Sequence, residues 1–136
     1  MPRSEECIVL HVEDDDGMAY LFRMALQNID ATIELYRVAD GEEAAKFLSR
    51  ARPYDDAPIP DLIVLDLNLP RKSGFDVLHD IRRLPHLESV PVFVVTSSGR
   101  ESDQQRALAL GATGVFQKPD NFNTLALVAE QIWSAI

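Results

Sequence analysis

Short apolar runs alternate with longer amphipathic segments along the chain, five times in all. The apolar runs predict strands over residues 7–13, 32–38, 62–67, 91–96 and 114–117, and the segments that follow them predict helices over 18–28, 41–50, 74–83, 101–110 and 122–133. Regular alternation of this kind predicts an α/β fold, in which a parallel sheet carries helices on both faces.

Local signals support several of these boundaries. Asp40 is placed to cap the second helix, with Glu43 three residues later to close a capping box. Gly111 is the glycine expected just past the end of a helix. A length of 136 residues suits one domain. We therefore expect a single domain over 1–136, with its core in 7–133 and no output domain.

Composition narrows the setting. No apolar run approaches the roughly 20 residues that a membrane span requires, and the first residues, MPRSEEC, lack the apolar stretch of a secretion signal. Cys7 is the one cysteine and is expected to be a small apolar residue of a strand. These features predict a cytoplasmic protein without a membrane partner. The formal net charge of −9 argues against nucleic acid as a partner.

The stretch LIVLDLNLPRKSGF shows why the acids matter more by position than by number. Asp66 follows an apolar run, and a buried carboxylate is costly without a partner. Polar residues end three other predicted strands as well, and the carboxyl ends of parallel strands share one edge of a sheet. Taken singly, each could be a helix cap or a surface residue. Together they predict one site, formed by Glu13, Asp14, Asp15, Asp66, Thr96, Ser97 and Lys118.

The charges of this set predict a metal ion. Two carboxylates about 4 Å apart repel by roughly 4 kcal/mol at an effective dielectric near 20, and Lys118 alone cannot balance Glu13, Asp14 and Asp66. A divalent cation would do so, and oxygen ligands with neither His nor Cys favour Mg²⁺ over zinc. His11, two residues before Glu13, is expected to project into the core.

Four motifs, VEDD, LDLNLPRKSG, VVTSSG and FQKP, occur in an order and spacing that resemble a response regulator receiver domain over almost the whole chain. The resemblance implies a (βα)5 flavodoxin-like three-layer sandwich whose parallel five-stranded sheet has the order 2-1-3-4-5. The segment DLNLPRKSGFDVL further resembles stand-alone regulators that partner phytochrome histidine kinases. A sensor histidine kinase, with phytochromes as candidates, is therefore the expected partner.

The resemblance also implies a role for each site residue. Asp66 would be the phosphoacceptor, attacking phosphorus as a carboxylate nucleophile. Mg²⁺ would be bound by Glu13, Asp14, Asp66 and the backbone carbonyl of Asn68. Thr96, Ser97 and Lys118 would bind the phosphoryl group. The protein would be a signalling protein rather than an enzyme, with chemistry limited to its own phosphorylation and dephosphorylation.

Two further expectations concern the region around the fifth strand. The Lys118–Pro119 peptide bond is expected to be cis, as in receivers. Val115 stands where receivers commonly carry an aromatic residue, so their aromatic switch is unavailable. We expect self-association through the fourth helix, fifth strand and last helix, with four apolar residues as candidates for the contact: Leu108, Val115, Leu127 and Val128.

Three alternatives remain at this point. A receiver fold could act as an adaptor without phosphorylation. A haloacid-dehalogenase-type phosphatase also uses an aspartate after an apolar strand, but it needs a second acid where this chain has Asn68. A flavin-binding electron carrier needs a hydroxyl-rich and glycine-rich phosphate loop after the first strand, and the sequence EDDDG does not suit phosphate.

Overall fold

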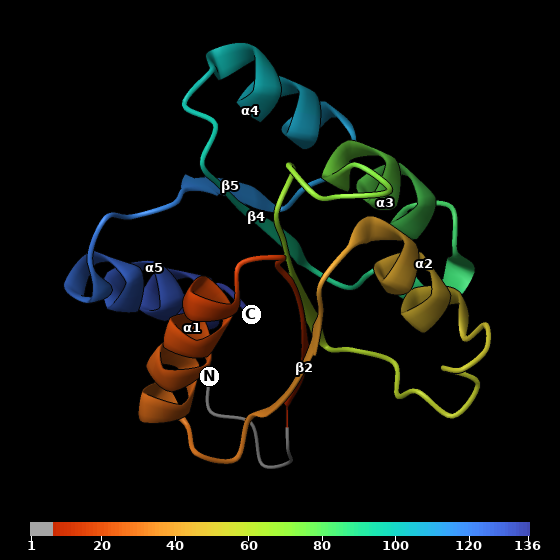
Figure 1. The fold of residues 1–136 in the computed structure, drawn as a ribbon, viewed down its shortest axis with the longest axis horizontal. Helices are drawn as coiled ribbons and strands as arrows, with labels where there is room; N and C mark the ends of the chain where they lie inside the picture. Colours follow the sequence, from red (N-terminus) through yellow and green to blue (C-terminus); the bar gives the residue numbers. More distant parts are fainter. Residues whose placement is uncertain (1–6) are drawn as a thin grey trace.

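The computed structural model describes residues 7–136, in which five strands alternate with five α-helices (Figure 1). The strands are β1 (Ile8–Val12), β2 (Glu34–Val38), β3 (Leu62–Leu65), β4 (Val92–Thr96) and β5 (Gly114–Gln117). The helices are α1 (Asp16–Ile29), α2 (Gly41–Ser49), α3 (Gly74–Ile81), α4 (Glu101–Ala109) and α5 (Phe122–Ser134). The predicted alternation is confirmed, with boundaries that differ by a few residues.

All five strands form one parallel sheet of order β2-β1-β3-β4-β5, as expected. The chain moves outward from β1 to the edge strand β2 and then crosses back to β3 on the other side of β1. All four residues of β3 are buried, because this central strand is covered on both faces. The strand order changes direction between β1 and β3, so the ends of these two strands are where a ligand site is expected.

Helices cover both faces of the sheet and divide the core in two. On one face, α1 and α5 pack side by side over a cluster that includes Phe22, Leu26 and Ile132. On the other face, α2, α3 and α4 enclose a second cluster that includes Phe47 and Leu78. Every helix in the described part of the chain is too short or too polar to cross a membrane.

Side-chain caps fix the start of several helices. Asp40 Oδ1 accepts a hydrogen bond of 2.8 Å from the Glu43 amide, as the sequence predicted. The reciprocal half of the capping box is replaced, because Glu43 Oε1 accepts a bond from Tyr54 Oη. Gly111 follows α4 with φ of +108°, a conformation that side chains disfavour.

One basic side chain has a structural role that its sequence context did not indicate. Arg82 follows α3 and is partly buried. Its guanidinium donates hydrogen bonds to the carbonyls of Gly111, Leu87 and Val90. It thereby joins α3 to the turn before β5 and to the short 3-10 helix Pro85–Leu87, which the apolar pattern did not predict.

Candidate functional site

The end of β1 supplies two of the acids. Glu13 follows β1, and its amide donates to the Val38 carbonyl at 3.1 Å, so its backbone is held against β2. Glu13 is 1% exposed, whereas Asp14 is exposed. Asp15 is the N-cap of α1 and accepts a bond from the Met18 amide. Glu13 and Asp14 therefore remain the candidate site residues at this strand end, while Asp15 has the capping role that the sequence left open.

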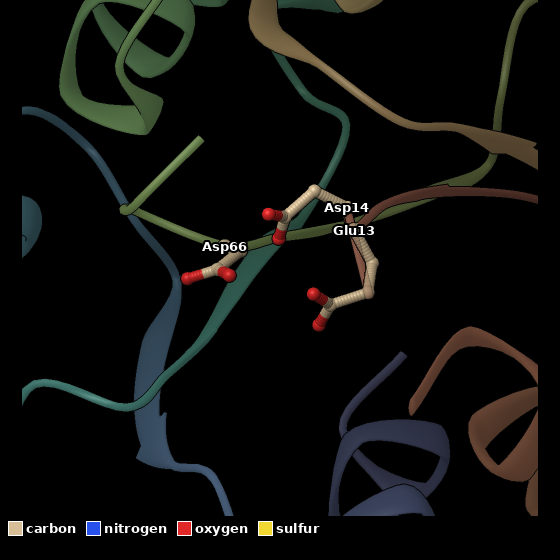
Figure 2. A group of neighbouring side chains, drawn as sticks. All are labelled: Glu13, Asp14 and Asp66. Carbon is tan, nitrogen blue, oxygen red and sulfur yellow. The ribbon is translucent and has the colours of Figure 1, made fainter. Parts of the chain in front are cut away.

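The end of β3 supplies the third acid. The Asp66 amide donates to the Val12 carbonyl at 3.1 Å, and the carboxylate is 3% exposed. Asp66 Oδ1 accepts a hydrogen bond of 3.2 Å from the Asn68 amide. Oxygen atoms of Glu13, Asp14 and Asp66 lie within 4.8 Å of one another. Figure 2 shows the three carboxylates gathered where β1 and β3 end.

Lys118 reaches this cluster from the end of β5. Its ammonium lies 2.8 Å from Glu13 Oε1 and 2.9 Å from Asp66 Oδ2. Its own amide donates to the Thr96 carbonyl at 2.7 Å, which fixes the chain beside β4. Four predicted residues from three strand ends are thus brought together.

The expectation of a cis bond at Pro119 is wrong. Arg52–Pro53 is the one cis peptide bond within residues 7–136, and Lys118–Pro119 is trans. Trans is the favoured isomer of X–Pro bonds in general, and with it the Lys118 side chain already reaches both carboxylates. A cis bond is therefore not needed to direct the ammonium into the site.

The electrostatics of the cluster leave negative charge in excess. Burial raises the pKa of the Glu13 carboxyl above its ordinary value, although the hydrogen bond from Lys118 acts in the opposite direction. Burial alone would lower the pKa of Lys118, but its bonds to Glu13 and Asp66 outweigh burial and raise it. Three carboxylates and one ammonium leave two negative charges when all are ionised. A divalent cation would balance them, and within the described chain no imidazole or thiol joins the group.

Thr96 and Ser97 end the neighbouring strand, β4. Thr96 is fully buried, and its hydroxyl oxygen accepts a hydrogen bond of 3.2 Å from the Ser98 amide. Because that bond uses a lone pair, the hydroxyl hydrogen is still available for donation. Ser97, the next residue, is exposed. A role for this pair in contacting a ligand bound over Asp66 stays a prediction.

Gly74 is a site-supporting residue that the sequence analysis missed. A Cβ at this position would lie 2.1 Å from the Asp66 carbonyl oxygen and 2.6 Å from Leu67 Cα. The Gly74 amide also donates to the Leu67 carbonyl at 2.9 Å. The first turn of α3 therefore packs directly on the backbone that carries Asp66. The signal was present, because Ser73-Gly74 is a helix start with the smallest residue at the first helical position.

The apolar residues proposed for self-association divide into two groups. Leu108 on α4 is 45% exposed and Leu127 on α5 is 58% exposed, as expected. Val115 on β5 is partly buried against the core. The outward position expected for Val128 is wrong, since it is 8% exposed and packs in the cluster beneath α5. Val128 is one of the buried residues of α5, whereas Phe122 and Trp133 on the same helix are only partly buried.

His11 lies in the core, as predicted. It is 3% exposed, and its ring centroid lies 4.7 Å from that of Phe22. Burial, with a smaller contribution from nearby cations, lowers the pKa of its imidazole to about 3. The imidazole is therefore neutral and packs in the core against α1.

Comparisons with known proteins agree with this geometry. The response regulator Rcp1 of Synechocystis sp. (strain ATCC 27184 / PCC 6803 / Kazusa) is 35% identical over 127 residues, which are 93% of this chain and 86% of Rcp1. The structure of the phosphorylated cyanobacterial phytochrome response regulator RcpA superimposes with a TM-score of 0.89 at 35% identity, over 93% of this chain and 91% of RcpA. The Mn²⁺-bound form of Rcp1 superimposes with a TM-score of 0.88 at 34% identity, over 94% and 92% of the two chains.

The family model of the response regulator receiver domain matches residues 9–130, which include every residue of the acidic cluster and Lys118. The matched region contains the acids at the ends of β1 and β3 and the lysine at the end of β5. It also spans the strands that form the sheet of order β2-β1-β3-β4-β5. The chain belongs to the response regulator receiver domain family.

Proposed function

We propose that this protein is a response regulator that accepts a phosphoryl group on Asp66 from a histidine kinase. The observation that carries the proposal is the convergence of Glu13, Asp14, Asp66 and Lys118 at one edge of the sheet. Asp66 has one oxygen bonded to Lys118 and the other to the Asn68 amide, so its carboxylate is oriented before any substrate arrives.

The donor set fits Mg²⁺. Glu13, Asp14 and Asp66 would bind it together with the backbone carbonyl of Asn68, and the charge excess of the cluster matches a divalent ion. When bound, the ion would neutralise charge that develops on the transferred phosphoryl group. The raised pKa of Glu13, caused by burial, supports this assignment because a buried carboxylate gains most from a nearby cation.

The chain's own residues would carry out the transfer. An Asp66 oxygen attacks phosphorus, a P–O bond forms, and the P–N bond to the kinase histidine breaks with its electron pair left on the imidazole. Lys118 would pair with the incoming phosphoryl oxygens in place of its present contact with Glu13. The Thr96 hydroxyl and the Ser97 amide would donate hydrogen bonds to the same group.

The kinase is proposed to be of the phytochrome class, because Rcp1 and RcpA are similar over more than nine tenths of this chain and RcpA is a phytochrome response regulator. Output would pass through protein contacts. The exposed Leu108 and Leu127 support self-association on the face formed by α4, β5 and α5. Val115 cannot act as an aromatic switch, so the phosphorylation signal would have to reach this face by other contacts.

Phosphotransfer is tested by incubating the protein with acetyl phosphate, and then with candidate kinases, in Mg²⁺ and in chelator. Intact mass spectrometry should find one added phosphoryl group with Mg²⁺ only. Asp66→Asn should abolish the label, whereas Asp76→Asn, on an exposed position of α3, should retain it. Absence of label with every donor would favour a phosphorylation-independent adaptor. Continuous turnover of a phosphate ester would favour a phosphatase.

A further inference from the structure

Arg37 connects the edge strand β2 to the acidic loop between β1 and α1. Its Nε donates to the Glu13 carbonyl at 2.8 Å, and its Nη1 lies 2.8 Å from Asp16 Oδ1. The Arg37 side chain is 24% exposed and the Asp16 side chain 92%, so the contact runs from the covered edge of β2 to the surface. Two nitrogens of one planar guanidinium therefore bind the first and last residues of the segment Glu13–Asp16.

This contact adds a second hydrogen bond that holds the Glu13 backbone to β2. The Glu13 amide donates to the Val38 carbonyl, and the Glu13 carbonyl accepts from Arg37, so both backbone polar groups are bound to β2. The segment between the two Arg37 contacts carries Asp14, the exposed member of the acidic cluster. The guanidinium is a rigid fork, and the separation of its two partners is set by its geometry.

We propose that Arg37 is a positioning residue of the divalent-cation site, holding the loop so that Glu13 and Asp14 face Asp66. The inference rests on the proposed function, because it presupposes that the cluster binds a cation. The charge of Arg37 and its positioning role predict opposite effects on cation affinity when Arg37 is replaced. Removing a positive charge near the site would by itself strengthen cation binding, whereas releasing the loop would weaken it. The sign of the change in affinity therefore identifies the role.

The experiment is calorimetric titration of the purified protein with MgCl₂, using wild type, Arg37→Met and Arg37→Lys. Methionine keeps an apolar stem of similar reach without charge or donors. We expect Arg37→Met to weaken Mg²⁺ binding about tenfold or more, the usual effect of losing a group that orients a metal ligand. Lysine keeps the charge and can donate one bond to Glu13, so it should recover part of the affinity.

Arg23→Met is the matched control. Arg23 lies on α1 and lines the same surface pocket as Arg37, Asp16 and Tyr20, and within the described chain it makes no hydrogen bond to Glu13 or Asp16. Its removal takes away a similar charge without releasing the loop. We expect Mg²⁺ binding by this variant to be unchanged or slightly tighter.

Three more measurements separate positioning from a general loss of structure. Urea unfolding in chelator reports whether Arg37→Met is still folded. Labelling by acetyl phosphate should be slow at low Mg²⁺ and approach the wild-type rate at saturating Mg²⁺, because the defect lies in binding. A general structural defect would lower the saturated rate too. Asp16→Asn should weaken binding in the wild type but have little further effect in the Arg37→Met background.

The outcomes are distinct. Equal or tighter Mg²⁺ binding by Arg37→Met would overturn the inference while leaving the proposed function intact. Equal effects of Asp16→Asn in both backgrounds, or a depressed rate at saturating Mg²⁺, would also overturn it. If Arg37→Met is unfolded, Arg37→Lys decides. Weaker Mg²⁺ binding than that of wild type supports positioning, and equal or tighter binding rejects it. A wild type that does not bind Mg²⁺ would instead reject the proposed function.

Discussion

Replacing Lys118 with Met tests the charge balance of the acidic site. The Lys118 ammonium lies 2.8 Å from a Glu13 oxygen and 2.9 Å from an Asp66 oxygen, and both acids are almost fully buried. At an effective dielectric near 20, each attraction is worth about 6 kcal/mol before desolvation is counted. Removing one partner from a buried ionic group leaves uncompensated charge and typically costs about 3–5 kcal/mol. We expect the free energy of unfolding in chelator at neutral pH to fall by this amount.

Urea unfolding followed by far-UV circular dichroism measures the change. With a urea dependence of about 2 kcal/mol per molar, the midpoint should fall by roughly 1.5–2.5 M. Mg²⁺ should restore part of the loss, because it binds the folded state and supplies the missing positive charge. Lys72→Met is the control. The Lys72 ammonium pairs with Asp80 where both side chains are partly exposed, and such pairs contribute about 1 kcal/mol or less.

The pH dependence gives an independent check. The pKa of Glu13 is already raised by burial, and loss of Lys118 removes a group that lowers it. A carboxyl whose pKa is raised on folding destabilises the folded state at high pH, and the penalty diminishes as pH falls through the folded-state pKa. The deficit of Lys118→Met should therefore be smaller at about pH 5 than at about pH 8. This account of the site would be refuted if Lys118→Met had the same urea midpoint as wild type. It would also be refuted if the loss of stability in Lys118→Met did not change with pH.

Three other predictions follow from single features of the structure. Gly74→Ala places a Cβ 2.1 Å from the Asp66 carbonyl oxygen, so we expect a loss of stability of about 2 kcal/mol or more and slower labelling by acetyl phosphate. His11 is neutral when folded, with a pKa of about 3, and protonates near 6.5 when unfolded. Wild type should therefore lose roughly 2 kcal/mol between pH 7 and pH 5 from this group, and a comparison of urea midpoints should show that His11→Leu lacks this loss. Leu108→Glu combined with Leu127→Glu should lower the molar mass measured by light scattering in the presence of a beryllofluoride mimic, and a wild type that is monomeric with and without the mimic would reject the interface.

The fold could be predicted from the sequence because its signals are local and strong. The apolar run that precedes Asp66 is buried at every position from Leu62 to Leu65, as expected of a central parallel strand. The acids and Lys118 could be predicted as a group because the carboxyl ends of parallel strands share one edge. Their convergence therefore follows from topology once the strand order is known, whichever helices surround them.

Features that depend on packing between distant segments were harder to predict. Helix phase alone placed Val128 outward, and the contact with the α1 layer turns it inward. Arg82 looks like a surface residue in sequence because its partners, among them the Gly111 carbonyl, come from a different turn. The need for glycine at position 74 can be recognised only when the Asp66 backbone is known to pass close to it. In each case the deciding neighbour is remote in the chain.

The Arg37 contact depends on strand register, which is more specific than strand order. In the parallel pair of β1 and β2, Arg37 lies opposite His11 and Val38 opposite Val12, and this alignment brings the guanidinium to the Glu13 carbonyl. Successive side chains of a strand point to opposite faces, so a shift of one residue would turn Arg37 away from the acidic loop. The buried Val38 keeps the register, because the same shift would expose it. A core valine and a half-buried arginine at neighbouring positions thus determine together how the loop that carries Glu13 and Asp14 faces Asp66.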